Sequence, residues 1–169
     1  MSQIGEAAVG SDANAAHVNT ILGHRSGPVG TAWMTALATP SAGHASFVAC
    51  LRPNMALQPP TLVVSKATTT EPAHQHLLWG AGQAGVASGV LRAVAEGIVA
   101  AAEVDDLVLI CALWINPEAN DADKVYANNA EATYLSLRNG ARGFPAVQDL
   151  LASRHEGVNG YFTASGVTQ

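Results

Sequence analysis

One short segment, AAHVNTILG, places a histidine and an amide where they could act together. Its apolar residues favour a β-strand, in which successive side chains point to opposite faces of a sheet. His17 and Asn19 therefore share one face with Ile21, while Val18 and Leu22 point the other way. An imidazole titrates near neutral pH, so this face is a candidate site for acid or base chemistry.

A second apolar segment, TLVVSKATT, ends with a lysine and a hydroxyl. The same period of two puts Leu62, Val64, Lys66 and Thr68 on one face. A lysine on an apolar face is unusual unless it is paired or reaches solvent. On these residues alone, Lys66 also fits an edge-strand lysine that discourages further strand pairing, and His17 fits a hydrogen-bonded structural histidine.

The other histidines give no clear site. His74 and His76 have no Cys, Asp or Glu at a matching ligand spacing, so a solvated loop is favoured over a metal centre. His24, His44 and His155 stand in expected loops and are interpreted as surface residues. The sequence contains no P-loop, GxGxxG, GxSxG, HExxH or CxxC motif. We therefore predict no metal site.

The elements that must position these residues follow from the hydrophobic pattern. Short apolar runs alternate with longer helical patterns, which predicts an α/β or α+β fold. The run PEANDADK is interpreted as a helix start capped by Asn120 or Asp121. A further short helix is expected after Gly143. We expect strands at residues 4–9, 17–23, 45–52, 61–70 and 107–115, and helices at residues 28–38, 83–101 and 120–139.

The middle helix carries a strip of small residues. Gly85, Gly89, Ala93 and Gly97 recur at a spacing of four, so they share one face. Each interior glycine costs a helix about 1 kcal/mol relative to alanine. We expect another backbone, from the sheet or from a neighbouring subunit, to pack closely against this strip.

Composition limits the class of protein. The 169 residues fit one domain, and charged residues make up only 12% of them, about half of the roughly 25% that is typical of soluble domains. Part of an apolar surface should therefore be buried against other copies, which predicts a homo-oligomer. Eight basic and thirteen acidic residues give a net charge of −5 without a basic stripe, so nucleic acid is not an expected partner.

Targeting signals and disulfides are not expected either. The N-terminal residues lack a signal-peptide pattern, and the most apolar long stretch, residues 98–115, is interrupted by three carboxylates. Cys50 and Cys111 lie in apolar runs, the usual setting of buried free thiols. These features predict a cytoplasmic protein without a membrane partner.

Several blocks of the sequence together resemble the formaldehyde-activating enzyme family, from about Ile4 to Arg138. These are GEAAVG, AAHVNTILGHRSGPVGTA, RPN followed by PPTLVVSKAT, WGAGQAGVA, AVAEGIV and DDLVLICALWINPEANDADKVYANNAEAT. The resemblance implies a fold like the second domain of ribosomal protein S5, with a mixed sheet packed against helices. It also implies a cytoplasmic homopentamer that condenses formaldehyde with tetrahydromethanopterin, a co-substrate bound between subunits, and it implies no further cofactor.

The resemblance also assigns roles to particular residues. The family's catalytic histidine falls on His17, and its pterin-contacting positions fall on Asn19, Val48, Lys66, Thr68 and Gln83. His17 is then expected to protonate the departing hydroxide of a carbinolamine, because imidazolium is an effective acid near pH 7. Gln83 is expected at the start of a helix, where backbone N–H groups are free to meet a ligand.

Two features depart from the family pattern. Asn19 stands where an aspartate is usual, and an amide cannot supply the negative charge that would stabilise an imidazolium. The chain from about residue 143 also differs, so we expect one domain over residues 1–169 with a C-terminal extension. Two alternatives to the enzyme remain: a non-catalytic protein that binds or senses a pterin or formaldehyde, and condensation with a different pterin or folate.

Overall fold

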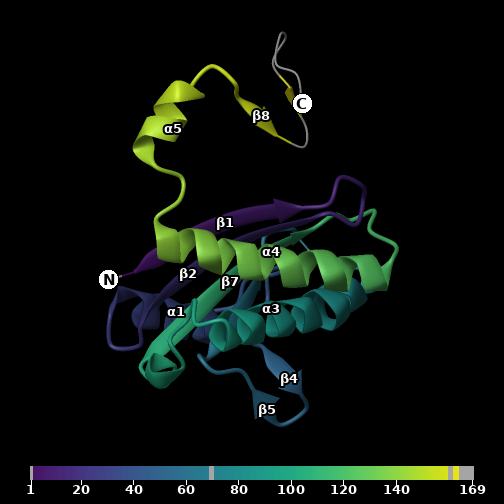
Figure 1. Cartoon of the computed structure of the whole chain (residues 1–169). Coiled ribbons are helices and arrows are strands. Elements are labelled where there is room, and N and C mark those ends of the chain that lie inside the picture. The colour runs from purple at the N-terminus through teal and green to yellow at the C-terminus, as the bar shows by residue number, and fades with distance from the viewer. Residues whose placement is uncertain (1, 69–70, 160–161, 164–169) are drawn as a thin grey trace.

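A five-stranded mixed sheet forms the middle of the molecule (Figure 1). The computed structural model describes residues 2–68, 71–159 and 162–163. The strand order is β1-β2-β7-β6-β3, in which β6 and β7 are parallel and the other pairs are antiparallel. The elements are β1 (Gln3–Val9), β2 (Ala16–His24), α1 (Pro28–Ala38), β3 (Phe47–Val48), β4 (Cys50–Arg52), β5 (Met55–Ala56), β6 (Thr61–Ser65), α2 (Pro72–His76), α3 (Gln83–Ala95), β7 (Leu107–Ile115), α4 (Ala122–Arg142), α5 (Val147–Ala152), β8 (Val158–Asn159) and β9 (Phe162–Thr163).

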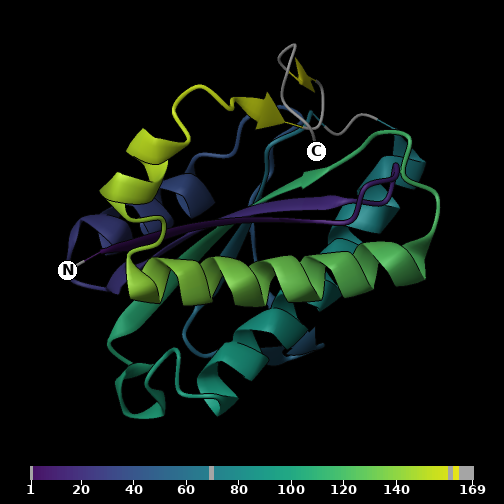
Figure 2. The same ribbon diagram turned by 45° about the horizontal axis from the view of Figure 1, so that its top comes forward.

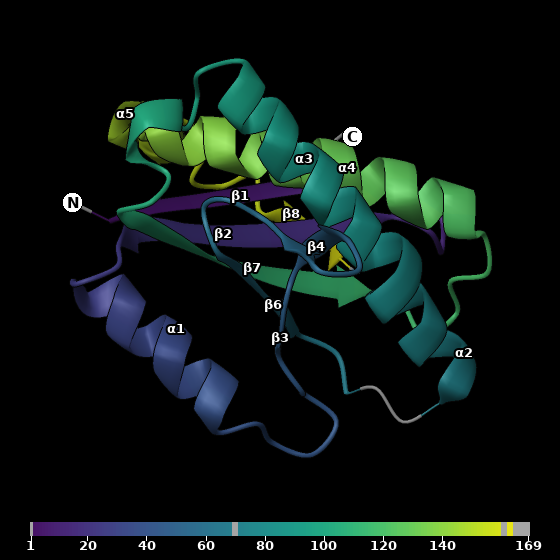
Figure 3. The ribbon, with the colours of Figure 1, turned by 90° about the horizontal axis from the view of Figure 1, so that it is seen from below.

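The two faces of the sheet are covered differently, as Figure 3 shows from below. Helices α3 and α4 cover one face, where alternate residues of β2 and β7 such as Val18, Leu109 and Leu113 are buried. Helix α1 lies on the opposite side and packs through Val29 against Gly23 at one end of β2. We call this second side the open face. The mixed α/β architecture predicted from the sequence is confirmed.

The last part of the chain leaves the helix layer. Helix α4 ends at Arg142, and Gly143 follows in the left-handed conformation (φ 62°), which glycine adopts without strain. Helix α5 and strand β8 then lie on the β1 side of the sheet (Figures 1 and 2). The short helix expected after Gly143 is therefore present.

The glycine strip of α3 packs against α4. A Cβ atom added at Gly85 would lie 2.5 Å from the carbonyl oxygen of Tyr126, and one at Gly89 would lie 2.5 Å from that of Ala130. The partner is thus a helix of the same chain, and not the sheet or another subunit. Gly97 does not belong to the strip, because α3 ends at Ala95 and Gly97 has a φ of 75°.

Most predicted elements are present with small shifts. Asp121 is the N-cap of α4, since its Oδ1 accepts a hydrogen bond of 3.1 Å from the Lys124 N–H. The predicted strand 45–52 is divided at Ala49, whose backbone bonds to Thr61 and Leu57 on either side. The predicted strand 61–70 ends at Ser65, and residues 69–70 lie outside the described part of the chain.

The segment around His74 corrects one prediction. The expected solvated loop is helical: α2 continues through a π-helical turn over Leu77–Gly82 directly into α3. His74 is buried, and its Nε2 lies 2.8 Å from the carbonyl oxygen of Ile115. The sequence could not show this partner, which is 41 residues away along the chain.

The remaining histidines and the cysteines are mixed in outcome. His24 and His155 are exposed as predicted, whereas His44 is half-buried, with its Nδ1 3.0 Å from the Ser65 carbonyl oxygen. Both thiols are free, and Cys111 is buried where Cys50 is only partly so. Burial raises the pKa of the Cys111 thiol to about 12.

The described residues contain neither a membrane-spanning helix nor a group of metal ligands. None of the helices within residues 2–68, 71–159 and 162–163 combines the length and the apolar character needed to cross a membrane. The same ranges contain no group of three or more His, Cys, Asp or Glu side chains placed to hold a metal ion.

Candidate active site on the open face

Strand β2 carries His17 and Asn19 to the open face, as its period of two predicts. Their neighbours Ala16 and Val18 are buried under the helices, whereas His17 and Asn19 are half-buried. The antiparallel register places Ala8 of β1 and Trp114 of β7 on either side of His17. The imidazole thus stands in the middle of a sheet face that α3 and α4 leave uncovered.

Lys66 joins this pair from the end of β6. Its backbone N–H donates to the Leu113 carbonyl oxygen at 2.7 Å, which continues the β6–β7 ladder by one residue. Its ammonium donates to Asn19 Oδ1 at 2.6 Å and lies 3.3 Å from His17 Nδ1. The three side chains predicted from two separate strands therefore form one cluster.

A carboxylate completes the cluster on the other side of the imidazole. Glu6 of β1 places its Oε1 2.9 Å from His17 Nε2, and its side chain is 60% exposed against 43% for His17. Glu6 was not predicted from the sequence as a site residue. The alternation in GEAAV places its side chain on one face of a strand, but the sequence does not show which strand pairs with it. The hairpin register pairs Glu6 with Asn19 and so puts both side chains on one face.

The charges of the cluster oppose one another. Partial burial lowers the pKa of Lys66 from its ordinary value of 10.5, because desolvation disfavours the ammonium, and the negative charge of Glu6 acts in the opposite direction. An ammonium group donates hydrogen bonds and accepts none. When Lys66 is charged and the ring is neutral, His17 Nδ1 is therefore the acceptor, and Nε2 carries the hydrogen that faces Glu6.

Three residues of this cluster, Glu6, His17 and Lys66, line a groove of about 880 Å³. The turn between β1 and β2 forms one wall, and the end of β7 with the residues after it forms another. Strand β8 of the C-terminal segment also contributes, through Val158 and Asn159. The residues that line the groove are Glu6, Ala8, Gly10, Ser11, Asp12, Ala13, Ala15, Ala16, His17, Lys66, Trp114, Asn116, Glu118, Val158 and Asn159.

The three other predicted contact residues are not gathered around His17 in this chain. Val48 pairs with Leu62 on the edge strand β3, three strands away from β2 in the sheet order. Thr68 bonds through its Oγ1 to His44 Nε2 at 3.0 Å.

Gln83 is held elsewhere again. Its side-chain oxygen accepts a hydrogen bond of 2.7 Å from the Cys50 N–H. The expectation of free N–H groups at this position is wrong, because helical backbone precedes it and the Gln83 N–H is bonded to carbonyl oxygens of that segment.

One known protein family matches most of the chain. The family model for formaldehyde-activating enzyme (Fae) matches residues 4–162. The chain belongs to the formaldehyde-activating enzyme family. The resemblance noted from the sequence is thereby confirmed, and the cluster of His17, Asn19, Lys66 and Glu6 lies within the matched residues.

Relatives in this family include proteins of Methanosarcina barkeri, Methanosphaerula palustris and Archaeoglobus fulgidus. A 5,6,7,8-tetrahydromethanopterin hydro-lyase of Methanosarcina barkeri is 39% identical over 153 residues, which cover 90% of this chain and 86% of that protein. A bifunctional enzyme Fae/Hps of Methanosphaerula palustris is 36% identical over 159 residues, and one of Archaeoglobus fulgidus is 38% identical over 149 residues. The matches cover 40% and 38% of those two proteins, so this chain corresponds to only part of each bifunctional enzyme.

Proposed function

We propose that this protein condenses formaldehyde with tetrahydromethanopterin to give methylene-tetrahydromethanopterin. Membership of the formaldehyde-activating enzyme family and a relative named tetrahydromethanopterin hydro-lyase support the reaction. The observation that carries the proposal is the imidazole of His17, held between Lys66 and Glu6 in a groove of about 880 Å³. A groove of this size accommodates a ligand as large as a pterin ring system.

The chemistry gives His17 a defined task. A pterin N–H adds to formaldehyde and forms a carbinolamine, whose hydroxyl leaves as water only after it gains a proton. His17 supplies that proton as a general acid, and the C–O bond breaks to leave an iminium carbon. The second pterin nitrogen closes onto this carbon and loses its proton, which restores the acid. One water leaves for each methylene bridge formed, and no carbon changes its oxidation state.

The remaining contact residues support a site between subunits. Val48, Thr68 and Gln83 do not line the groove of His17 within one chain, so we propose that a neighbouring copy brings its own set to the pterin. An apolar helix, α1, is available for such contacts: it has no charged residue, and Met34 is 59% exposed. The family resemblance favours a homopentamer for this assembly.

Other parts of the proposal rest on the sequence. One domain over residues 1–169, with an extension from about residue 143, agrees with a single central sheet. The two free thiols agree with a cytoplasmic location. The closer likeness to the second domain of ribosomal protein S5 stays a prediction.

The proposal is tested by the initial rate of methylene-tetrahydromethanopterin formation. The wild-type rate is expected to exceed the protein-free rate in the same buffer, and His17→Ala is expected to remove a factor on the order of 10² or more of that excess. A wild-type rate equal to the spontaneous rate would contradict the proposal. It would favour a binding protein or a different acceptor, which titration with pterins and folates would distinguish.

A further inference from the structure

We propose that Glu6 is a positioning residue that holds the ring of His17, the general acid of the proposed reaction. The proposal rests on the proposed function, because it explains how this chain keeps an acid at His17 while Asn19 offers no negative charge. The direct observation is the 2.9 Å contact between Glu6 Oε1 and His17 Nε2. A carboxylate at that distance stabilises the protonated ring by charge and directs it by a hydrogen bond.

The register explains why Glu6 and Asn19 reach the same cluster. They are direct partners across the β1–β2 pair, so their side chains leave the sheet on the same face. Asn19 accepts from Lys66 Nζ at 2.6 Å and therefore holds the lysine side chain. Glu6 supplies the negative charge that the Asn19 amide lacks.

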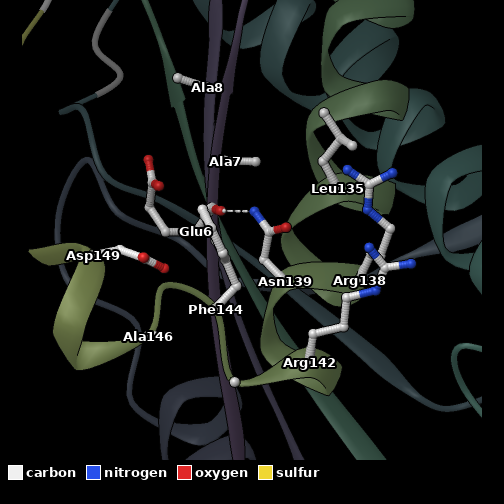
Figure 4. A pocket seen from close by; sticks show the side chains of 11 residues that line it. Glu6, Ala7, Ala8, Leu135, Arg138, Asn139, Arg142, Phe144, Ala146 and Asp149 are labelled. Atoms are coloured by element: carbon white, nitrogen blue, oxygen red, sulfur yellow. Dashed lines mark hydrogen bonds between the residues drawn. The ribbon is translucent and has the colours of Figure 1, made fainter.

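Strand β1 is fixed tightly enough to make this contact specific. Asn139 of α4 donates to the Glu6 carbonyl oxygen at 3.0 Å (Figure 4). A Cβ atom at Gly5 would lie 1.8 Å from the Ser136 carbonyl oxygen, so glycine lets β1 lie directly on α4. Both contacts hold the Glu6 backbone from the helix side, and its side chain projects to the opposite, open face.

Competing charges do not account for the orientation of Glu6. Figure 4 shows its carboxylate pointing away from the guanidinium groups of Arg138 and Arg142. All three residues line a second cavity, of about 540 Å³. The other charged groups that line the His17 groove are Lys66, Asp12 and Glu118.

Their contacts leave Glu6 as the counter-charge of the ring. Asp12 pairs with Lys124 Nζ at 3.0 Å. Lys66 is a cation and disfavours a second positive charge beside it. Glu6 is therefore the carboxylate that contacts His17 in the described part of the chain.

The first test is NMR of the His17 ring nitrogens in the full-length protein without substrate. Glu6→Gln keeps the shape of the side chain and removes its charge. We expect the chemical shift of Nε2, the ring nitrogen that faces Glu6, to change because the charge-assisted contact is lost. The matched control Glu118→Gln, which lines the same groove, is expected to leave this chemical shift unchanged. An unchanged Nε2 chemical shift in Glu6→Gln would overturn the proposal.

The second test uses the reaction. For Glu6→Gln we expect kcat to fall by a factor on the order of 10 to 10², with little change in KM. Glu6→Gln with Asn19→Asp restores a carboxylate to the cluster and is expected to recover most of kcat. Failure of the second carboxylate to rescue a correctly folded double variant would contradict the proposal. The NMR measurement needs no turnover, so it separates failure of this inference from failure of the proposed function.

Discussion

At the scale of single residues, holding the partly buried ammonium of Lys66 lowers the stability of the folded chain. Burial lowers its pKa, so the folded chain holds this ammonium less readily than the unfolded chain does. Between the lowered pKa and 10.5 the unfolded state binds more protons, and stability therefore rises with pH across that window. Below the window the full cost of holding the charge is present, which includes neutral pH.

A substitution at Lys66 should expose this cost. We expect Lys66→Met to raise the thermal unfolding midpoint at pH 7, and the gain to shrink as the pH approaches 10.5. Lys124→Met is the control: Asp12 raises the pKa of Lys124, so its removal should give no gain at pH 7. Calorimetric scans of the three proteins across pH measure both effects. A gain for Lys66→Met that does not depend on pH would show that packing, and not charge, is responsible.

Residue periodicity found much of the site. The period of two was enough to place His17 and Asn19 on one face of β2, because strand parity is a local property. Their meeting with Lys66 was expected only from the family resemblance. Glu6 was missed because its role depends on the register between two strands. The buried contact of His74 was missed for a similar reason, since its partner at Ile115 is distant in the chain.

At the scale of elements, the contact between α3 and α4 depends on the absence of side chains. Gly89 allows the Ala130 carbonyl oxygen and the Thr133 Cβ to approach within 2.5 and 2.8 Å of where a Cβ would stand. A backbone oxygen cannot rotate out of the way as a flexible side chain can. The close approach therefore outweighs the better helix propensity of alanine, which amounts to about 1 kcal/mol.

We expect Gly89→Ala to destabilise the protein by about 1–3 kcal/mol, the usual cost of overpacking a core. Gly80→Ala is the control, because Gly80 is also helical but has nothing within 4 Å of an added Cβ. That variant should be neutral or slightly stabilised. Urea unfolding of both variants compares their free energies. Equal stability of Gly89→Ala and the wild type would mean that the two helices can separate without cost.

Most elements were predictable because their patterns are local. Strand β7 and helix α1 have the predicted bounds. The strip of small residues on α3 correctly predicted a close backbone contact. The partner of that strip could not be read from the strip itself. The end of α3 at Ala95 was also missed, because Gly97 fits a helical spacing of four as well as it fits a left-handed turn.

At the scale of the whole molecule, the low share of charged residues is matched by apolar side chains exposed on α1. Helix α1 buries only Val29 and Gly30, while Met34 and Leu37 are 59% and 39% exposed. Large exposed apolar patches are typical of interfaces. The sequence predicted that some surface must be covered, and the packing of α1 at one end of the sheet shows one apolar surface that remains available.

A substitution that dissociates the oligomer should therefore also weaken pterin binding. We expect wild-type protein to sediment as an assembly about five times the 17.3 kDa of one chain, and Met34→Glu to sediment as a smaller species. The introduced carboxylate would have to be desolvated in the interface, whereas Met34→Leu keeps an apolar side chain and should keep the assembly. Circular dichroism checks that both variants are folded. Because Val48, Thr68 and Gln83 do not line the groove of His17 within one chain, loss of the neighbour should raise KM for the pterin while His17 itself is untouched. A Met34→Glu protein that stays fully assembled would exclude α1 as the contact. One that dissociates yet keeps the wild-type KM would show that a single chain binds the pterin alone.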